Sequence, residues 1–337
     1  MTHENFSLVK LVDRAWLGES WCGMHVAVAL SGGADSVALL RAVLEIKRQA
    51  GGDGVVCALH VNHRLRGAES DEDADWCERL CRSLDVPLVV LKGDAAGRAA
   101  DDGDGIEAAA RAERYELLGQ AAERRGARYL ATAHTRDDQV ETVLLRLLRG
   151  AGQRGLRGIP RTRALTPALT LVRPLLDVSR DAIVAYLAEL DQPFRTDSSN
   201  LSPRFTRNRV RNQLLPLLRT EYGAEIDGAL VRLAAQADDA QQLLEGLAAG
   251  VLARCDLQRS DAQLSLLMEP LRSEPMIIVC EALRMTWREA RLAEQAMTFD
   301  WWQSLAKLAQ SSTEREVLNL PGNVRASTTE GRLLLEW

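Results

Sequence analysis

The sequence Val26-Ala27-Val28-Ala29-Leu30-Ser31-Gly32-Gly33-Ala34-Asp35-Ser36 decides the fold expected for this chain. Residues 26–30 form an apolar run that predicts a buried strand, and Val37, Leu40 and Leu44 then recur at helical spacing. Two adjacent glycines in the turn between them allow the backbone to approach a ligand without a Cβ atom in the way. The stretch therefore predicts a strand, a tight turn and a helix, with the turn as a candidate binding loop.

Backbone N–H groups of such a turn and of the first helical turn converge on one point, which suits a phosphate or diphosphate. The candidate binding residues of this phosphate loop are Ser31, Gly32, Gly33, Ala34, Asp35 and Ser36. A carboxylate beside an anion is repelled unless a cation lies between them, and Mg²⁺ carried with a nucleotide would supply that cation. Asp35 is therefore also the candidate metal ligand. The alternative is an ordinary turn in which Ser31 or Asp35 only caps the helix.

Positive charge is concentrated on particular segments of an acidic protein. The chain has 337 residues, which favours two domains, and a net charge of −5, which argues against indiscriminate coating of nucleic acid. Residues 142–176 nevertheless hold seven arginines and no Asp, Glu or Lys, and residues 201–220 hold five arginines and no acid. This distribution is typical of site-directed polyanion binding. Solvated arginines that pair with the acidic residues 69–75 and other acids remain the alternative.

The composition also indicates the cellular compartment in which the protein works. No window is long and apolar enough to span a bilayer, and residues 1–5 do not begin a secretory signal. Six scattered cysteines without a Cys-x-x-Cys pair are typical of reduced thiols. We therefore expect a cytoplasmic protein without a membrane partner. The oligomeric state stays open, with a homodimer among the alternatives.

Apolar strands alternate with helices through the first half of the chain. After the first strand we expect strands at residues 55–61, 87–91 and 129–133, with helices at 69–84, 106–125 and 137–148. Because these strands are apolar throughout, they predict an α/β fold with a parallel sheet covered by helices on both faces. Ligands of such sheets bind at the carboxyl ends of the strands. The phosphate loop and the segments that follow the second and fourth strands should therefore share one edge.

The second half of the chain reads as mainly helical. A glycine–arginine loop at 148–160 is followed by a helix at 179–190 and a basic segment at 197–211. A break near Tyr222 predicts two domains, residues 1–220 and 221–337. For the second domain we expect a long helix at 226–251, helices at 276–291 and 299–309, and a small β-meander from Glu316 to Trp337.

Polar side chains follow the second strand, namely His60, Asn62 and Arg66. They are expected to contact nucleotide or substrate, with a polar loop and helix cap as the alternative. In the next long helix Arg111 and Arg114 are one turn apart, as a phosphate or carboxylate clamp requires. Ion pairs with Glu107 are the alternative for these two arginines, and for Arg114 we favour that alternative.

The segment after the fourth strand, residues 134–142, is rich in acids. Asp137 and Asp138 could simply be helix-terminal acids favoured by the helix dipole. Acids beside a phosphate loop could instead hold Mg²⁺, or position and deprotonate an attacking amine. Since Glu141 lies one turn after Asp138, the two share a helix face. We favour the functional interpretation for this acid segment.

The phosphate loop resembles the pyrophosphate-binding loop of the ATP pyrophosphatases; it is not a Walker A loop, because no Gly-Lys-Ser/Thr follows. Six blocks in order extend the resemblance to the bacterial tRNA(Ile)-lysidine synthetases, from about His25 to about Tyr222, roughly two thirds of the chain. These blocks are residues 31–36, 60–66, 107–115, 134–142, 148–160 and 197–211. Some members of that family carry a further C-terminal domain, for which little sequence remains here.

The resemblance implies the reaction. ATP, with Mg²⁺, adenylates O2 of the wobble cytidine in tRNA(Ile) with a CAU anticodon, and pyrophosphate leaves. The ε-amine of free L-lysine then attacks C2, AMP departs and lysidine forms. The implied catalytic residues are Asp35, Asp137, Asp138 and Arg111, and His60 joins the phosphate loop at the nucleotide. The implied substrate and tRNA contacts are Asn62, Arg66, His134, Glu141, Arg204, Arg207, Asn208 and Arg211, with Arg209 beside them on the RNA phosphates and the domain 221–337 contacting tRNA.

Three other functions fit parts of the same pattern. A tRNA thiolase with a similar loop would generally need a reactive cysteine, and Cys57 and Cys77 are both expected to be buried. A small-molecule adenylating ligase would leave the arginine-only segments without a role. A nucleotide-dependent RNA-binding module without catalysis is the third alternative.

Overall fold

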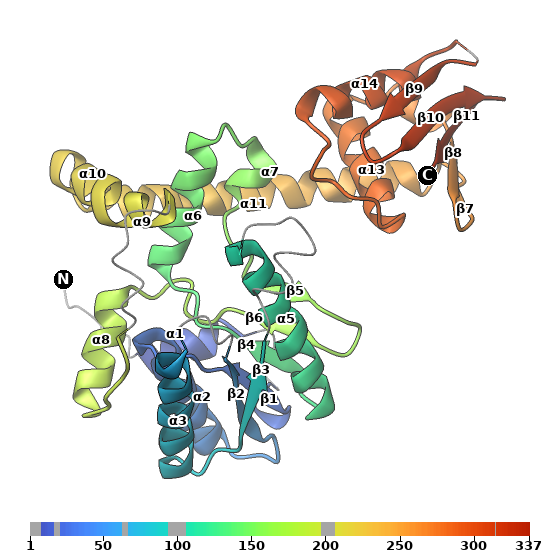
Figure 1. The fold of residues 1–337 in the computed structure, drawn as a ribbon. Coiled ribbons are helices and arrows are strands. Elements are labelled where there is room, and N and C mark those ends of the chain that lie inside the picture. Colours follow the sequence, from blue (N-terminus) through green and yellow to red (C-terminus); the bar gives the residue numbers. More distant parts are fainter. Residues whose placement is uncertain (1–7, 17–20, 63–66, 94–105, 197–205, 314) are drawn as a thin grey trace. The chain divides into compact units, whose positions relative to one another are not determined.

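The computed structural model describes residues 8–16, 21–62, 67–93, 106–196, 206–313 and 315–337 (Figure 1). The chain divides into two compact units, residues 1–234 and residues 235–337. The domain boundary expected at residue 220 stays a prediction.

The first unit is built on a six-stranded sheet in the order β3-β2-β1-β4-β6-β5. Strand β1 lies inside the sheet and pairs in parallel with β2 and β4, so that Val28 lies opposite Ala58 and Ala131. Only the edge strand β5 is antiparallel to its neighbour. The expected parallel α/β sheet is confirmed. The strands are β1 Val26–Ala29, β2 Val56–Asn62, β3 Leu88–Lys92, β4 Tyr129–Ala131, β5 Thr162–Ala164 and β6 Thr170–Val172.

Helices cover both faces of this sheet. Val26, Val28 and Leu30 pack with residues of α1, α2, α3 and α8, whereas Ala27 packs against α5 on the other face. Successive side chains of a strand point to opposite faces, so a strand buried on both faces must be apolar throughout. The helices are α1 Leu8–Arg14, α2 Ala34–Ala50, α3 Ala68–Ser83, α5 Ile106–Arg124 and α8 Arg180–Glu189, and a short turn η1 spans Trp21–Gly23.

A smaller core lies among the remaining helices of the first unit. Val140 and Val143 of α6 pack with Val210 and Leu215, which lie in a continuous helical segment. That segment contains one π-helical turn, η3, between two α-helices. The bounds are α6 Arg136–Leu148, α7 Gln153–Leu156, α9 Thr206–Arg209, η3 Val210–Leu214, α10 Leu215–Tyr222 and α11 Glu225–Leu252. This packing places the basic segment 206–211 beside the acid segment of α6.

The second unit encloses its own core, with Trp287 and Leu305 fully buried. Its five-stranded antiparallel sheet has the order β7-β8-β11-β10-β9. The expected meander corresponds to β9–β11; the sheet is larger because β8 pairs with β11 and β7 pairs with β8. The elements are β7 Gln258–Arg259, β8 Gln263–Leu267, α12 Glu269–Arg272, α13 Met276–Glu289, α14 Phe299–Gln310, β9 Val317–Leu320, β10 Val324–Thr329 and β11 Arg332–Glu336.

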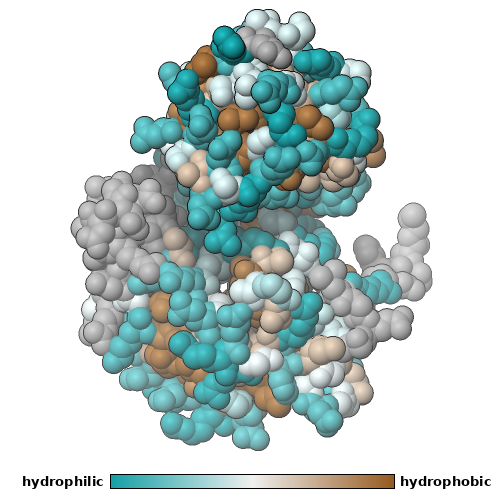
Figure 2. Space-filling model, turned by 90° about the vertical axis from the view of Figure 1, so that its right-hand side faces the viewer, coloured by the Kyte–Doolittle hydropathy of each residue, from teal (hydrophilic) through white to brown (hydrophobic). Residues whose placement is uncertain are grey.

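Hydrophilic residues predominate on the face shown in Figure 2, and hydrophobic residues form small groups among them. Within the described ranges, no helix combines the length and the apolar character needed to cross a membrane.

A buried lysine fixes the turns that precede the central strands. The Lys47 ammonium of α2 donates to the carbonyl oxygens of Cys22, Met24 and Gly54, at 3.0, 2.5 and 3.1 Å. It also lies 5.7 Å from the ring centroid of Trp21. One side chain therefore connects α2 to the turn before β1 and to the turn before β2.

Replacing Lys47 by methionine is expected to lower the free energy of unfolding by about 2–3 kcal/mol, because three partly buried carbonyl oxygens lose their donor. Urea unfolding measures the change. Arg48→Ala is the control on the same helix, since the Arg48 side chain is 74% exposed and its ion pair with Glu45 contributes little in water. Equal losses of unfolding free energy in the two variants would contradict a structural role for the three Lys47 hydrogen bonds.

Candidate active site

The phosphate loop connects β1 to α2, and its shape is fixed from within. The buried Ser36 hydroxyl accepts the Ser31 N–H (3.1 Å) and donates to the Gly33 carbonyl (3.0 Å). Gly33, which has no side chain, is the N-cap of α2, and no side chain caps the helix. The alternative in which Ser31 or Asp35 is the cap is therefore wrong. The N–H groups of the first turn of α2 keep no side-chain acceptor, which suits an anionic ligand.

Gly32 is required by both its backbone and its surroundings. Its φ of +85° is a conformation that favours glycine. An added Cβ would lie 3.4 Å from the sulfur of Cys77 and from the ring of Trp76. The Gly32 carbonyl also accepts the Arg195 N–H at 2.9 Å, and the Arg195 side chain pairs with Asp73 at 2.8 Å. The loop is therefore fixed by Arg195 of a distant segment as well as by its own Ser36.

The two glycines give a matched pair of variants. Gly33 has a φ of −71°, which alanine adopts without strain. Gly33→Ala should leave stability within about 0.5 kcal/mol of the parent, whereas Gly32→Ala should cost about 1–2 kcal/mol. Gly33→Ala should weaken binding of ATP, the nucleotide expected from the sequence, because among the described residues the only atom near its Cβ is the Ser31 hydroxyl at 3.5 Å and the Cβ would occupy the open side of the loop. The Cβ of Gly32→Ala would point toward Cys77 and Trp76, so that variant should change stability more than ATP binding. Thermal unfolding and nucleotide titration measure the two effects; unchanged ATP binding by Gly33→Ala would contradict a phosphate loop.

His60 and Asn62 support the neighbourhood of this loop. The buried His60 Nδ1 lies 2.8 Å from the Leu30 carbonyl oxygen, one residue before the loop. Burial lowers the pKa of His60, so the neutral ring donates this hydrogen bond. Asn62 Nδ2 donates to Asp71 at 2.8 Å. Contact of these two residues with nucleotide or substrate stays a prediction, and Arg66 lies outside the described residues.

Asp138 has three partners at the start of α6, namely Thr135, Arg207 and, at 3.4 Å, Arg211. Thr135 is the N-cap, and its N–H donates to Asp138 Oδ2 at 2.9 Å in a reciprocal capping box. The other carboxylate oxygen accepts from Arg207 at 2.8 Å. Burial opposes the charged form, but the Thr135 hydrogen bond and the charge of Arg207 lower the pKa of Asp138. The carboxylate is therefore held charged at neutral pH.

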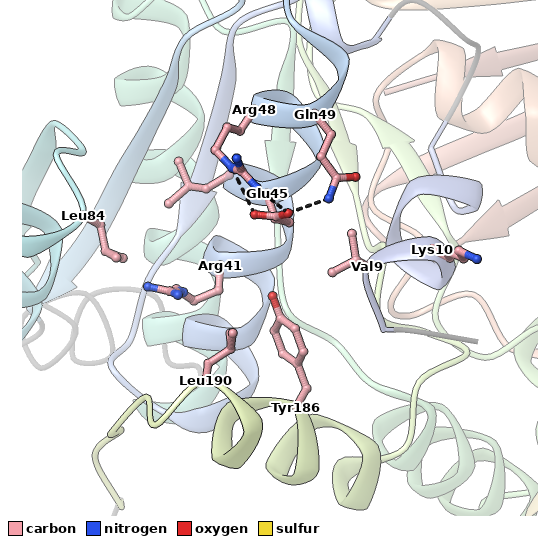
Figure 3. Close-up of a pocket in the computed structure, with 10 residues that line it drawn as sticks. Val9, Lys10, Arg41, Glu45, Arg48, Gln49, Leu84, Tyr186 and Leu190 are labelled. Atoms are coloured by element: carbon pink, nitrogen blue, oxygen red, sulfur yellow. Dashed lines mark hydrogen bonds and ion pairs between the residues drawn. The ribbon is translucent and has the colours of Figure 1, made fainter. Parts of the chain in front are cut away.

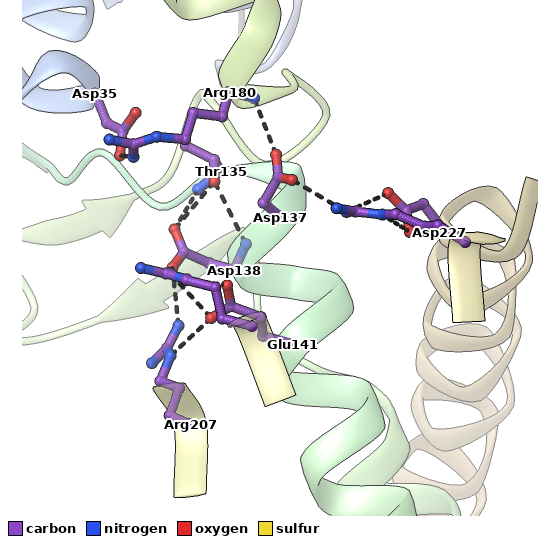
Figure 4. Close-up of polar contacts among 10 residues, drawn as sticks. Asp35, Thr135, Asp137, Asp138, Glu141, Arg180, Arg207 and Asp227 are labelled. Carbon is purple, nitrogen blue, oxygen red and sulfur yellow. Dashed lines mark hydrogen bonds and ion pairs between the residues drawn. The ribbon is translucent and has the colours of Figure 1, made fainter. Parts of the chain in front are cut away.

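Glu141 lies one turn further and is 1% exposed. Arg207 Nε donates to one of its oxygens at 2.9 Å, and Arg211 binds both (Figure 4). Two guanidinium groups thus neutralise the carboxylates of Asp138 and Glu141. Arg207 and Arg211, expected to contact RNA, are paired with acids in this structure, so their RNA contacts stay a prediction. Asn208 lies between them on α9, and Arg204 lies outside the described residues.

Arg180 connects the phosphate loop to the acid segment. Its side chain donates to Asp35 Oδ2 at 2.9 Å, and its backbone N–H donates to Asp137 Oδ2 at 2.9 Å (Figure 4). Arg219 reaches Asp137 at 3.4 Å and pairs with Asp227 at 2.7 Å. The sequence did not single out Arg180, which no local pattern marks, or Arg219, which is only one of the five arginines of residues 201–220.

One oxygen of Asp35 is suited to a metal ion. Oδ1 is buried and has no hydrogen-bond partner in the structure. Burial raises the pKa of Asp35, and the charge of Arg180 opposes this increase. In the part of the chain that the structure describes, no group of three His, Cys, Asp or Glu side chains is arranged to bind a metal. A single carboxylate combined with phosphate oxygens is a common way to bind Mg²⁺, so Asp35 fits that role.

His134 and Arg111 lie in a positively charged environment. The Nδ1 atom of His134 is 3.1 Å from the Thr132 hydroxyl. Burial lowers the pKa of His134 to about 4, and the charges of Arg173 and Arg111 contribute. Arg111 lies on α5, with its guanidinium 5.6 Å from the ring centroid of Tyr115.

This histidine should make the fold acid-sensitive. A base whose pKa is lower in the folded state than in the unfolded state loses stability as pH falls through its unfolded value near about 6.5. Between pH 7 and pH 5 the free energy of unfolding should therefore fall by about 1–2 kcal/mol through His134. Urea unfolding at both pH values should show a smaller decrease for His134→Gln. An identical decrease in parent and variant would contradict the assignment.

A separate cavity of about 640 Å³ lies near the other end of α2 (Figure 3). It is lined by Val9, Lys10, Arg41, Leu44, Glu45, Arg48, Gln49, Leu84, Tyr186 and Leu190. None of the predicted site residues lines it, and Glu45 in its wall already pairs with Arg48 at 2.8 Å.

Known proteins have sequences similar to a large part of this chain. A sequence model of the PP-loop domain matches residues 15–218. The tRNA(Ile)-lysidine synthase of Porphyromonas gingivalis is 47% identical over 224 residues, 66% of this chain and 45% of that protein. The protein of the same name from Deinococcus radiodurans is 40% identical over 79% of this chain and 43% of its own length. The chain thus spans less than half the length of these relatives.

The fold has a counterpart among solved structures. The U34-tRNA thiolase NcsA from Methanococcus maripaludis has a TM-score of 0.57 and 17% sequence identity, over 68% of this chain and 76% of that one. At this identity the likeness shows the fold alone. The domain match covers more than half of the chain and includes the phosphate loop and the acid segment. The chain therefore belongs to the PP-loop family of ATP pyrophosphatases.

Proposed function

We propose that this protein ligates free lysine to C2 of the wobble cytidine of tRNA(Ile) with a CAU anticodon, forming lysidine, AMP and pyrophosphate. The observation that carries the proposal is the Arg180 bridge, because it joins Asp35 of the phosphate loop to Asp137 of the acid segment. The candidate phosphate loop and the carboxylates of the acid segment thus lie side by side. The curated relatives named above support the same reaction.

The first step is adenylation of the base. The C2 carbonyl of cytosine is a poor electrophile, so its oxygen must become part of a leaving group. That oxygen attacks the α-phosphorus of ATP, and pyrophosphate departs toward the N–H groups of Ala34, Asp35 and Ser36 at the start of α2. Mg²⁺ held by Asp35 and the phosphates would neutralise charge that develops on the leaving group.

The second step needs a neutral amine. The lysine ε-ammonium has a reference pKa of about 10.4 and must lose a proton before it attacks C2. Asp137, whose side chain is 29% exposed, would bind the ammonium and accept that proton. Asp138 and Glu141 would become available to the amine where Arg207 and Arg211, their partners in this structure, turn to the RNA phosphates. Attack at C2 expels AMP, with the adenylated oxygen as the leaving atom.

The RNA enters as a single strand, whose bases can be turned out of the stack into such a site. Arg204, Arg207, Asn208 and Arg211 would hold its phosphates, and residues 221–337 would contact the remainder of the tRNA. With this role the protein would act in the cytoplasm, the compartment expected from the sequence.

Incubation with CAU-anticodon tRNA(Ile), ATP, Mg²⁺ and radiolabelled lysine tests the proposal. Label should be retained on the RNA and should depend on ATP. Replacing the wobble cytidine by uridine is the control, because uracil keeps the C2 carbonyl but lacks the 4-amino group and the unprotonated N3 that make O2 of cytosine nucleophilic. Label on the control RNA, or no label on the CAU tRNA, would overturn the proposal.

The thiolase alternative is disfavoured by the cysteines. Cys57 and Cys77 are buried, and burial raises the pKa of Cys77 to about 12, so its thiol stays protonated. The same assay run with a sulfur donor in place of lysine separates the two activities.

A further inference from the structure

Two arginines lie beside one tyrosine near β5, the edge strand of the sheet. The Tyr115 ring, on α5, lies 5.0 Å from the Arg163 guanidinium and 5.6 Å from that of Arg111. Arg163 belongs to the edge strand β5 and is exposed. The positions come from separate parts of the chain, so the fold has assembled them.

A third arginine lies beneath this pair. Arg173 follows β6 and is 4% exposed, and its NH1 donates to the Pro160 carbonyl at 2.6 Å. Its Nε is buried and has no hydrogen-bond partner. A buried donor without an acceptor is costly, and it indicates that an acceptor is supplied by something else.

The charges in this arginine cluster (Arg111, Arg163 and Arg173) oppose one another. Burial lowers the pKa of Arg173, Tyr115 opposes the decrease, and the charges of Arg163 and Arg111 add to it. Over the described ranges, none of the three forms an ion pair with a carboxylate. Like charges held together without a counter-charge favour an anionic ligand.

We propose that the arginine cluster and Tyr115 bind a backbone phosphodiester of the single-stranded RNA next to the reacting base. The proposal rests on the function proposed above. Guanidinium groups that stack on an aromatic ring are typical of single-stranded RNA sites. The triphosphate of ATP is a less suitable occupant, because β4 and β6 separate the phosphate loop after β1 from the edge strand β5.

Arg163→Gln tests the proposal, because Arg163 is exposed and its replacement should leave the fold intact. The affinity for CAU-anticodon tRNA(Ile) should fall about 5- to 10-fold, and the slope of log Kd against log salt concentration should decrease in size by about 0.7. Arg163→Lys should keep the salt slope but lose part of the affinity. Arg82→Gln is the matched control, since Arg82 is 75% exposed at the C-terminal end of α3 and should change neither quantity.

The other outcomes are distinguishable. If the parent protein neither binds this tRNA nor incorporates lysine, the proposed function fails. If the parent does both and Arg163→Gln behaves like Arg82→Gln, only the phosphodiester site is wrong. A fall in ATP affinity with unchanged tRNA affinity would also overturn it, by assigning the cluster to the nucleotide.

Discussion

Asp35→Asn is expected to reduce lysidine formation by at least about 1,000-fold while the protein stays as stable as the parent. The catalytic loss follows from the buried Oδ1 atom, which has no protein partner. Its carboxylate is also the only charged side chain among residues 31–36. The amide of asparagine is a weak ligand for Mg²⁺ next to phosphates and cannot balance charge there.

The free energy of unfolding of Asp35→Asn should not fall with its activity. The pKa of Asp35 is raised by burial, so the charged carboxylate is less favourable in the folded chain than in the unfolded chain at neutral pH. Asparagine removes that cost and loses only a half-exposed ion pair with Arg180, worth less than about 1 kcal/mol. The melting temperature should therefore stay level or rise.

Thermal unfolding, ATP titration and lysine incorporation measure these effects in one variant. Asp177→Asn, which removes a carboxylate that is 54% exposed and paired with Arg161, is the control and should leave turnover unchanged. A protein that only binds RNA would have no turnover to lose, so activity in the parent and its loss in Asp35→Asn also exclude the RNA-binding module. Full turnover by Asp35→Asn would contradict the metal-ligand role.

Local sequence patterns predicted the strand, loop and helix around Ser31 because each element is coded by adjacent residues. The apolar runs at residues 55–61 and 129–133 likewise marked β2 and β4. Strands β5 and β6 could not be found in this way. Each has three residues, and their place in the sheet depends on pairing, of β6 with β4 and of β5 with β6, and not on an apolar run.

The partners of the charged residues could not be predicted. Arg207 and Glu141 are 66 positions apart, and their ion pair exists because α6 and η3 share a small apolar core. The arginines of the segment 142–176 also divide into different roles. Arg146 donates to the carbonyls of Gly155 and Gly158 and shapes their loop, whereas Arg163 is exposed beside Tyr115. Composition alone does not separate a structural arginine from a binding one.

Glu141→Gln is expected to lower the free energy of unfolding by about 2–4 kcal/mol and to reduce lysine incorporation by more than about 100-fold. Glu141 accepts from both Arg207 and Arg211, so its neutral replacement leaves two guanidinium groups with the carboxylate of Asp138 alone. The pKa of Arg211 shows the same balance. Burial lowers this pKa, but the hydrogen bond and the charge of Glu141 outweigh burial, so the pKa is raised. Glu45→Gln is the control; Glu45 is partly exposed and paired with the exposed Arg48, so its replacement should change stability far less.

A double variant separates the structural role of Glu141 from its role in the reaction. Adding Arg211→Gln to Glu141→Gln removes one guanidinium that the first change left unbalanced, so part of the lost stability should return. Lysine incorporation should not return, because the carboxylate that binds the substrate ammonium is still missing. Unfolding in urea and the KM for lysine measure the two effects in the four proteins of the cycle. If activity recovered together with stability, Glu141 would only hold the arginines in place, and binding of the lysine ammonium would fall to Asp137 and Asp138.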